Sequence, residues 1–212
     1  MRLGIFGGTF NPVHFGHLRA AEEVRQLLSL DKVIFIPSGN PPLKSSALAE
    51  ASHRYSMTRL ATGSNIYFLV SDLEMRQDER SYTVSTVDNL HRIYPEDKLF
   101  LILGLDAFMD LPHWKEPRRL VSSISFIVVT RPSCCESELT ASPFVEAIRP
   151  SDKPGIDSLV LRGGMESYVA RVSMFDISST MIRRLTKERM SIKYLLPESV
   201  EQYIHSHNLY CE

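Results

Sequence analysis

Short apolar runs alternate with helix-like segments from the N-terminus to the middle of the chain, and this alternation is typical of an α/β fold. Runs rich in Ile, Val and Phe predict buried strands; they read RLGIF, KVIFIP, IYFLV, LFLILG and ISFIVVT. Between them lie HLRAAEEVRQLLSL, SHRYSMTRLAT and TVSTVDNLHRIY, in which apolar residues such as Leu18, Ala21 and Val24 recur at helical spacing. Strands that alternate with helices form βαβ units, so the pattern predicts a parallel sheet.

Length, charge and cysteine content narrow the class of protein. A chain of 212 residues fits one domain, with two as the weaker alternative. The formal net charge of −1 provides no basic field, so we expect no nucleic-acid partner. Cys134, Cys135 and Cys211 fit neither a zinc spacing nor a disulfide framework, which favours the reducing cytoplasm. No apolar run has the length of a secretory signal or a membrane span, so we expect a cytoplasmic protein without a membrane partner.

The stretch GGTFNPVHFGHL, residues 7–18, follows the first predicted strand. In open parallel sheets ligands bind beyond the carboxyl ends of the strands, which is where this stretch lies. Gly7 and Gly8 allow close approach of the backbone to a ligand. The next helix should begin near residues 15–17, so its free N–H groups form an anion site. His14 and His17 share one face of its first turn and can hydrogen-bond phosphate oxygens.

Other interpretations of this stretch stay open or are excluded by the residues. The histidines could simply cap the helix or face solvent in an ordinary strand-to-helix turn. A metal pair would need further Cys, Asp or Glu ligands, and none is adjacent. A P-loop is excluded because no GK[ST] follows the glycines, and the G-x-G-x-x-G fingerprint is absent.

A second cluster, FDISSTMIRRL, spans residues 175–185. Ser178 and Ser179 are good N-caps for the amphipathic segment that follows. Thr180 and Arg183 then lie one turn apart on one face, which predicts a second anion site. The alternative is a capped helix that carries a surface arginine.

Together the two clusters resemble the signatures of nucleotidylyltransferases. GGTFNPVHFGHL resembles their H-x-G-H motif and ISSTMIR resembles their S-x-T-x-x-R motif. Within that superfamily the chain resembles most the nicotinate-nucleotide adenylyltransferases. Supporting stretches are IPSGNPPLK, SYTVSTVDNL, LILGLDAFMDLPHWKEP, VVTRP and YLLPESVEQYIHSHNLY. The resemblance covers most of the chain except residues 133 to about 174. The resemblance implies one domain over residues 1–212, a Rossmann-like doubly wound parallel sheet with a small helical C-terminal part from about residue 176.

The implied reaction joins ATP and nicotinate mononucleotide into nicotinate adenine dinucleotide and pyrophosphate. Mg²⁺ would arrive with ATP, largely water-coordinated and without a metal site on the protein. His17 would contact the α-phosphate in the transition state and His14 its neighbouring oxygens. Thr180 and Arg183, with amides near Ser179, would hold the β- and γ-phosphates. The oligomeric state is open, a homo-oligomer included.

The resemblance also assigns residues that bind the nucleotide. The backbone next to ATP would come from Gly7, Gly8, Thr9 and Phe10. Gly104 and Asp106 follow the fourth predicted strand, and Asp106 would accept from the ribose hydroxyls or, alternatively, only cap a helix. Arg131 follows the fifth strand and would contact the nucleotide, with an ordinary surface arginine as the alternative.

For the mononucleotide, the resemblance points to four residues. Trp114 would stack on the pyridine ring, although composition alone favours loop or core packing. The Thr86 hydroxyl and the backbone at Lys115 would donate to the nicotinate carboxylate. Lys44 would approach the phosphate, with an ordinary solvated lysine as the alternative.

The chain departs from the family pattern at Asn11, where Asp is usual, and at Lys115, where Tyr is frequent. Asn keeps the turn geometry and lacks the charge. The two signatures alone also suit pantetheine-phosphate adenylyltransferases and cytidylyltransferases, but the Trp114 loop and the SYTVST stretch favour the nicotinate enzyme. A non-catalytic nucleotide-binding domain is a further alternative, disfavoured because His17 and Arg183 are both present.

Overall fold

The computed structural model describes residues 1–41, 48–75, 80–130, 136–173 and 175–211. Within these residues the strands form one sheet in the order β3-β2-β1-β4-β5-β8-β7-β6. All five predicted strands are present: β1 Arg2–Gly8, β2 Lys32–Pro37, β3 Phe68–Val70, β4 Lys98–Gly104 and β5 Ser125–Thr130. They pair in parallel, as predicted.

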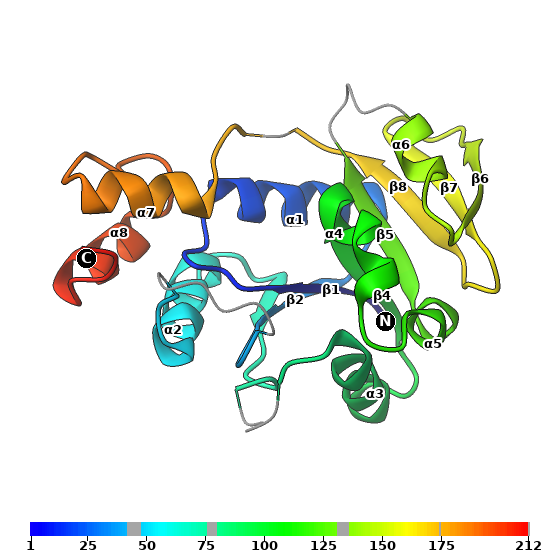
Figure 1. The fold of residues 1–212 in the computed structure, drawn as a ribbon, viewed down its shortest axis with the longest axis horizontal. Coiled ribbons are helices and arrows are strands. Elements are labelled where there is room, and N and C mark those ends of the chain that lie inside the picture. Colours follow the sequence, from blue (N-terminus) through cyan, green and yellow to red (C-terminus); the bar gives the residue numbers. More distant parts are fainter. Residues whose placement is uncertain (42–47, 76–79, 131–135, 174, 212) are drawn as a thin grey trace.

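The sheet continues beyond β5 with three strands that sequence analysis did not predict. They are β6 Val145–Pro150, β7 Ile156–Leu161 and β8 Ser167–Arg171. Strand β8 is parallel to β5, whereas β7 is antiparallel to both β8 and β6. The sheet is therefore mainly parallel, with an antiparallel hairpin at one edge. That hairpin lies at the opposite end of the molecule from the C-terminal helices (Figure 1).

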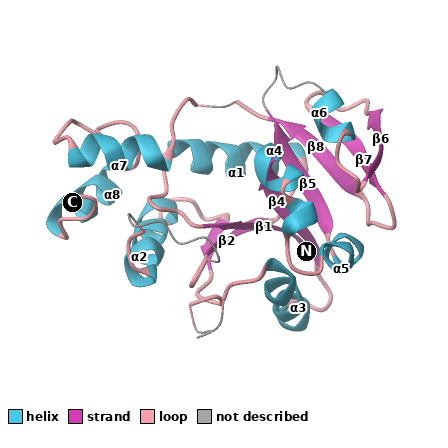
Figure 2. Ribbon diagram, viewed as in Figure 1, coloured by secondary structure: helices cyan, strands magenta, loops and turns pink. Residues whose placement is uncertain are grey.

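Helices cover both faces of the sheet, which confirms the doubly wound arrangement (Figure 2). One core cluster joins the sheet to α1 Phe15–Leu27, α2 Ala51–Thr62, α7 Ser179–Lys187 and α8 Glu198–Ser206. The cluster on the other face contains residues of α3 Thr83–Ile93, α4 Leu105–Met109, α5 Pro117–Ser123, α6 Glu136–Thr140 and the 3₁₀ turn Leu111–His113. Apolar side chains thus project from both faces of the sheet and pack against the helices, as in a buried parallel sheet.

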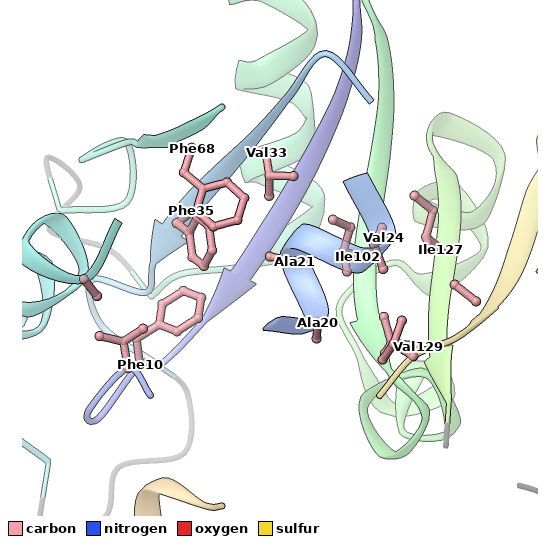
Figure 3. Packing of buried hydrophobic residues seen from close by; sticks show 14 of the residues in the cluster. Phe10, Ala20, Ala21, Val24, Val33, Phe35, Phe68, Ile102, Ile127 and Val129 are labelled. Carbon is pink, nitrogen blue, oxygen red and sulfur yellow. The ribbon is translucent and has the colours of Figure 1, made fainter. Parts of the chain in front are cut away.

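Helix α1 packs across the centre of the first cluster (Figure 3). Ala21 and Val24 are fully buried there, near Ile102 of β4. The Phe10 ring lies 5.7 Å from that of Phe35, so the loop after β1 is held in the same core. The C-terminal helices share this cluster; their separation as a subregion of a single domain stays a prediction.

The chain order of the strands places a switch point at β1. From β1 the chain builds β2 and β3 on one side, and it then returns to add β4 and β5 on the other. Ligands in such sheets bind at the carboxyl ends of the strands where the order reverses. Among the described residues, no helix is long and apolar enough to cross a membrane.

Candidate active site

A cleft of about 710 Å³ lies at the carboxyl edge of β4 and β5. Its walls come from the start of α1, the start of α4, helix α6 and the segment that enters α7. The lining residues are Phe6, His14, Gly16, His17, Ala20, Gly104, Leu105, Asp106, Val129, Thr130, Glu138, Phe175, Ile177, Ser178 and Ser179. The structure therefore brings both sequence motifs to one cleft at the switch point.

The two histidines of the first motif form a close pair of tilted rings at the start of α1. Their ring centroids are 3.8 Å apart, and His14 is the N-cap residue of the helix. The backbone N–H of His14 donates to Nδ1 of His17 at 3.3 Å. Because Nδ1 accepts this bond, we assign the imidazole proton of neutral His17 to Nε2. His17 can thereby act as a hydrogen-bond donor without carrying a charge.

Burial keeps both imidazoles neutral. It lowers the pKa of His14 to about 4. It lowers the pKa of His17 to about 3, and the neighbouring His14 contributes further. Aromatic rings surround His17, since the Phe10 ring lies 5.2 Å from its imidazole and the Phe6 ring 6.2 Å. Neither histidine is suited to be a general base that must gain a proton near neutral pH.

Of the residues just before the histidines, Phe10 packs against the pair through the His17 ring. Phe10 has a positive φ of 47° and is buried, and a Cβ on Gly8 would lie 3.1 Å from its ring. Gly7 and Thr9 are exposed. None of Gly7, Gly8, Thr9 and Phe10 lines the cleft, so their contact with ATP stays a prediction.

The second motif forms the start of α7 and docks on the first. Ser178 caps the helix, as predicted, by accepting from the Met181 N–H at 3.1 Å. Ser179 donates through its hydroxyl to the Pro12 carbonyl oxygen at 2.8 Å. Its neighbour one turn on, Arg183, donates to the hydroxyl of Thr180 at 3.1 Å. Thr180 and Arg183 therefore lie together as predicted, although neither lines the cleft.

Two predicted nucleotide residues, at the end of β4 and the start of α4, reach the cleft. Gly104 and Asp106 both line it, and the Asp106 side chain is exposed there. The alternative role of Asp106 as a helix cap is wrong, because Gly104 is the N-cap of α4 and Asp106 lies within its first turn. Arg131 and Lys44 lie outside the described residues.

Three described residues were predicted to bind the nicotinate group, and all three lie outside the cleft lining. Trp114 donates through Nε1 to Asp110 at 3.2 Å and packs partly buried against the core. Lys115 places its ammonium 4.4 Å from the centre of the Tyr82 ring, which brings its loop next to the start of α3. Thr86 is buried in α3 with its hydroxyl bonded to a carboxylate, so its side chain does not face open solvent.

The cleft also contains residues that sequence analysis did not assign. Phe175 lies in the wall of the cleft with 47% of its surface exposed. It is the first residue of the FDISSTMIRRL cluster, and this position is the feature of the sequence that could have identified it. Glu138 comes from the segment for which the sequence carried no prediction. Among the described residues, no three His, Cys, Asp or Glu side chains are grouped to hold a metal ion.

Comparisons with known proteins agree with this arrangement. Residues 5–185 match the family model described as cytidylyltransferase-like. The chain is 42% identical over 213 residues to a probable nicotinate-nucleotide adenylyltransferase of Geotalea daltonii, covering 99% of this chain and 98% of the relative. It is 44% identical to one from Moorella thermoacetica, covering 99% and 91%. A solved structure, Plasmodium falciparum nicotinic acid mononucleotide adenylyltransferase complexed with NaAD, superposes with a TM-score of 0.76 at 21% identity, covering 99% and 97%.

Proposed function

The chain belongs to the nicotinate-nucleotide adenylyltransferases within the cytidylyltransferase-like family, and from this premise we propose how its cleft works. The reaction transfers the adenylyl group of ATP to nicotinate mononucleotide, releasing pyrophosphate in the synthesis of NAD. The observation that carries the assignment to this cleft is the neutral histidine pair at the start of α1, with the second motif bonded to its loop. We place the reaction in the cytoplasm.

The reaction requires hydrogen-bond donors and does not require a general base. The nucleophile is a phosphate oxygen of the mononucleotide, which is already anionic at neutral pH. The barrier arises because negative charge accumulates as this anion attacks the α-phosphate. Positioning and electrostatic stabilisation therefore supply the rate acceleration. His17 donates from Nε2 to the α-phosphate in the transition state. His14 binds adjacent phosphate oxygens.

The start of α7 holds the part of ATP that leaves as pyrophosphate. Ser179 and Thr180 lie in the first turn, where free backbone N–H groups attract anions. The guanidinium of Arg183 has five N–H groups, so it can keep its two protein bonds and still bind phosphate. Asp106 accepts from the ribose hydroxyls, with Gly104 beside it. Arg131 contributes to nucleotide contact, and Gly7, Gly8, Thr9 and Phe10 supply backbone near ATP.

Mg²⁺ enters as part of the substrate, bound to the phosphates of ATP, where it neutralises charge. Asp106 and Glu138 are the carboxylates of the described cleft lining. They come from different segments and form no grouped ligand set, which suits an ion that keeps most of its water.

The mononucleotide occupies the half of the site beside β1 and β2, across the switch point from the cleft. Trp114 stacks on the pyridine ring, and the backbone at Lys115 donates to the nicotinate carboxylate. Thr86 donates to the same carboxylate, which requires its hydroxyl to leave Glu74 on binding. Lys44 meets the mononucleotide phosphate.

A pyrophosphate-release assay tests this function. The purified protein with ATP and Mg²⁺ is given nicotinate mononucleotide, nicotinamide mononucleotide or phosphopantetheine, and the dinucleotide product is identified by mass. We expect rapid release with nicotinate mononucleotide only. Turnover with phosphopantetheine, or with CTP in place of ATP, would assign the chain to another nucleotidylyltransferase. Absence of release with every pair would leave a binding domain without this activity.

A further inference from the structure

Arg54 of α2 is among the largest fully buried side chains of the protein, with 1% of its surface exposed. Its guanidinium donates to three backbone carbonyl oxygens: from Nε to Ala49 at 3.0 Å, from Nη1 to Thr9 at 2.9 Å and from Nη2 to Gly39 at 3.1 Å. Burial lowers the pKa of Arg54, yet an arginine keeps its proton in proteins. A buried charge is costly unless it is hydrogen-bonded, and these bonds offset that cost.

The three carbonyls belong to segments that meet at the carboxyl edge of the sheet. Thr9 follows β1, Gly39 follows β2, and Ala49 comes before α2. A guanidinium is planar and its N–H groups point in fixed directions. One rigid group therefore sets the positions of the two loops that leave adjacent parallel strands.

The peptide at Gly39 has a second buried partner. Its backbone hydrogen-bonds the carboxylate of Glu74, a residue only 7% exposed. A Cβ on Gly39 would lie 2.1 Å from the Glu74 carbonyl oxygen, so only glycine fits this approach. The carboxylate of Glu74 also accepts from the Thr86 hydroxyl at 2.7 Å. The loop after β2 is thus clamped between α2 and the start of α3.

The loop after β1 reaches the described cleft at His14, whereas the loop after β2 lies on the other side of β1. The cleft takes its other walls from β4, β5, α6 and the segment that enters α7. A site that binds two nucleotides at a switch point uses both sides of it. We propose that Arg54 is a positioning residue for the mononucleotide half of the site, acting chiefly through the loop after β2; this inference rests on the proposed function.

Two variants disturb this clamp from opposite sides. Arg54→Lys keeps the charge and loses the planar fork. Gly39→Ala introduces the clash with Glu74 and leaves Arg54 intact. In each variant the KM for nicotinate mononucleotide should rise about 10-fold, while the KM for ATP changes less than about 3-fold, because displacement of a binding loop costs the substrate that it positions. Thr62→Val is the control, since the hydroxyl of this buried residue of α2 donates to the carbonyls of Thr58 and Arg59 in its own helix.

The wild-type protein provides a measurement that does not depend on a variant folding. In hydrogen–deuterium exchange, nicotinate mononucleotide should slow exchange in residues 38–41, and ATP should slow it in residues 176–182. An equal rise of both KM values in Arg54→Lys and Gly39→Ala, the same split in Thr62→Val, or no protection of residues 38–41 by the mononucleotide would overturn the role of Arg54. Failure of the wild-type enzyme to release pyrophosphate would instead refute the proposed function itself.

Discussion

The guanidinium of Arg183 donates to the carbonyl oxygen of Asn11 at 2.8 Å, across 172 positions of the sequence. The acceptor lies in the loop of the first motif and the donor in the helix of the second. On its other side, the amide oxygen of Asn11 accepts from the Tyr210 hydroxyl at 2.7 Å and from the Ala49 N–H at 3.1 Å. The two halves of the proposed phosphate site are therefore one connected unit, and the uncharged Asn11 fulfils its bonding role without a carboxylate.

Arg183→Lys should impair the enzyme strongly, because one ammonium group cannot reproduce a fork that bonds Asn11, Thr180 and phosphate at once. Loss of hydrogen bonds from a charged group predicts a fall in kcat/KM for ATP of about 10- to 100-fold. Steady-state kinetics with varied ATP measure it. The adjacent Arg184→Lys, on the exposed side of α7, is the matched control. Wild-type kinetics for Arg183→Lys would show that the arginine has no part in phosphate binding.

Replacements of His17 can distinguish the roles of its two ring nitrogens, Nδ1 and Nε2. Asn retains an oxygen near the Nδ1 position, so His17→Asn can still accept from the His14 N–H but has no donor at the Nε2 position. We expect a fall in kcat of about 10²–10³-fold, the effect of one lost transition-state donor. His17→Gln places an amide N–H₂ nearer the Nε2 position and should recover part of that loss. Stability measured by thermal unfolding should change little in His17→Asn; equal activity of the two variants would contradict the donor role.

The fold was predictable where strands are buried on both faces. Strands β1, β2, β4 and β5 appear in the sequence as nearly continuous apolar runs, since helices cover both sides. Strand β6 has the sequence VEAIRP, and only Val145 of it is buried. Because it contains polar residues, it does not form the apolar run that indicates a buried strand. Antiparallel strands at the edge of a sheet face solvent on one side, so polar and apolar residues alternate along them. Over a few residues this alternation is difficult to distinguish from the sequence of a loop.

The candidate site was predictable where the signal is local. A glycine-rich turn, a helix start and the serine cap of Ser178 can each be recognised within a few residues. The contacts of Arg54 could not be predicted, because backbone carbonyls accept hydrogen bonds whatever residue carries them. The same holds for the bond between Arg183 and Asn11. Long-range bonds to the main chain leave no pattern in the sequence.

Acid should destabilise the protein through its histidine pair. Burial lowers the pKa of His14 to about 4 and of His17 to about 3, whereas an unfolded histidine titrates near 6.5. Below pH 6.5 the unfolded chain binds more protons than the folded one, so the free energy of unfolding falls as the pH drops. Each histidine should cost roughly 2 kcal/mol at pH 5 relative to pH 7. Urea unfolding of the wild type and His14→Asn between pH 7.5 and 5 measures the effect; equal pH dependence in both would contradict it.

Trp114→Ala should weaken both the acid and the amide mononucleotide to a similar degree. An indole that stacks on a pyridine ring does not distinguish the carboxylate from the carboxamide. Trp114→Phe keeps an aromatic face and loses the bond from Nε1 to Asp110, so it controls for the loop conformation. Dissociation constants from calorimetry should rise about 10-fold for the alanine variant and less for the phenylalanine variant. Unchanged binding in Trp114→Ala would leave this tryptophan with loop packing alone.

Thr86→Val should act differently, by reducing the preference for the acid. Wild-type enzyme should favour nicotinate mononucleotide over nicotinamide mononucleotide by roughly 10⁴-fold in kcat/KM, because a donor-lined site leaves the amide N–H₂ facing other donors. Valine fills similar space without a hydroxyl, so the carboxylate loses a donor while the amide loses an unfavourable neighbour. The same change removes the bond to Glu74, which would affect both substrates equally if Thr86 only supported the fold. Thermal unfolding and kcat/KM for each mononucleotide distinguish the two roles. A ratio that stays at the wild-type value, with both efficiencies lowered together, would exclude Thr86 from substrate selection.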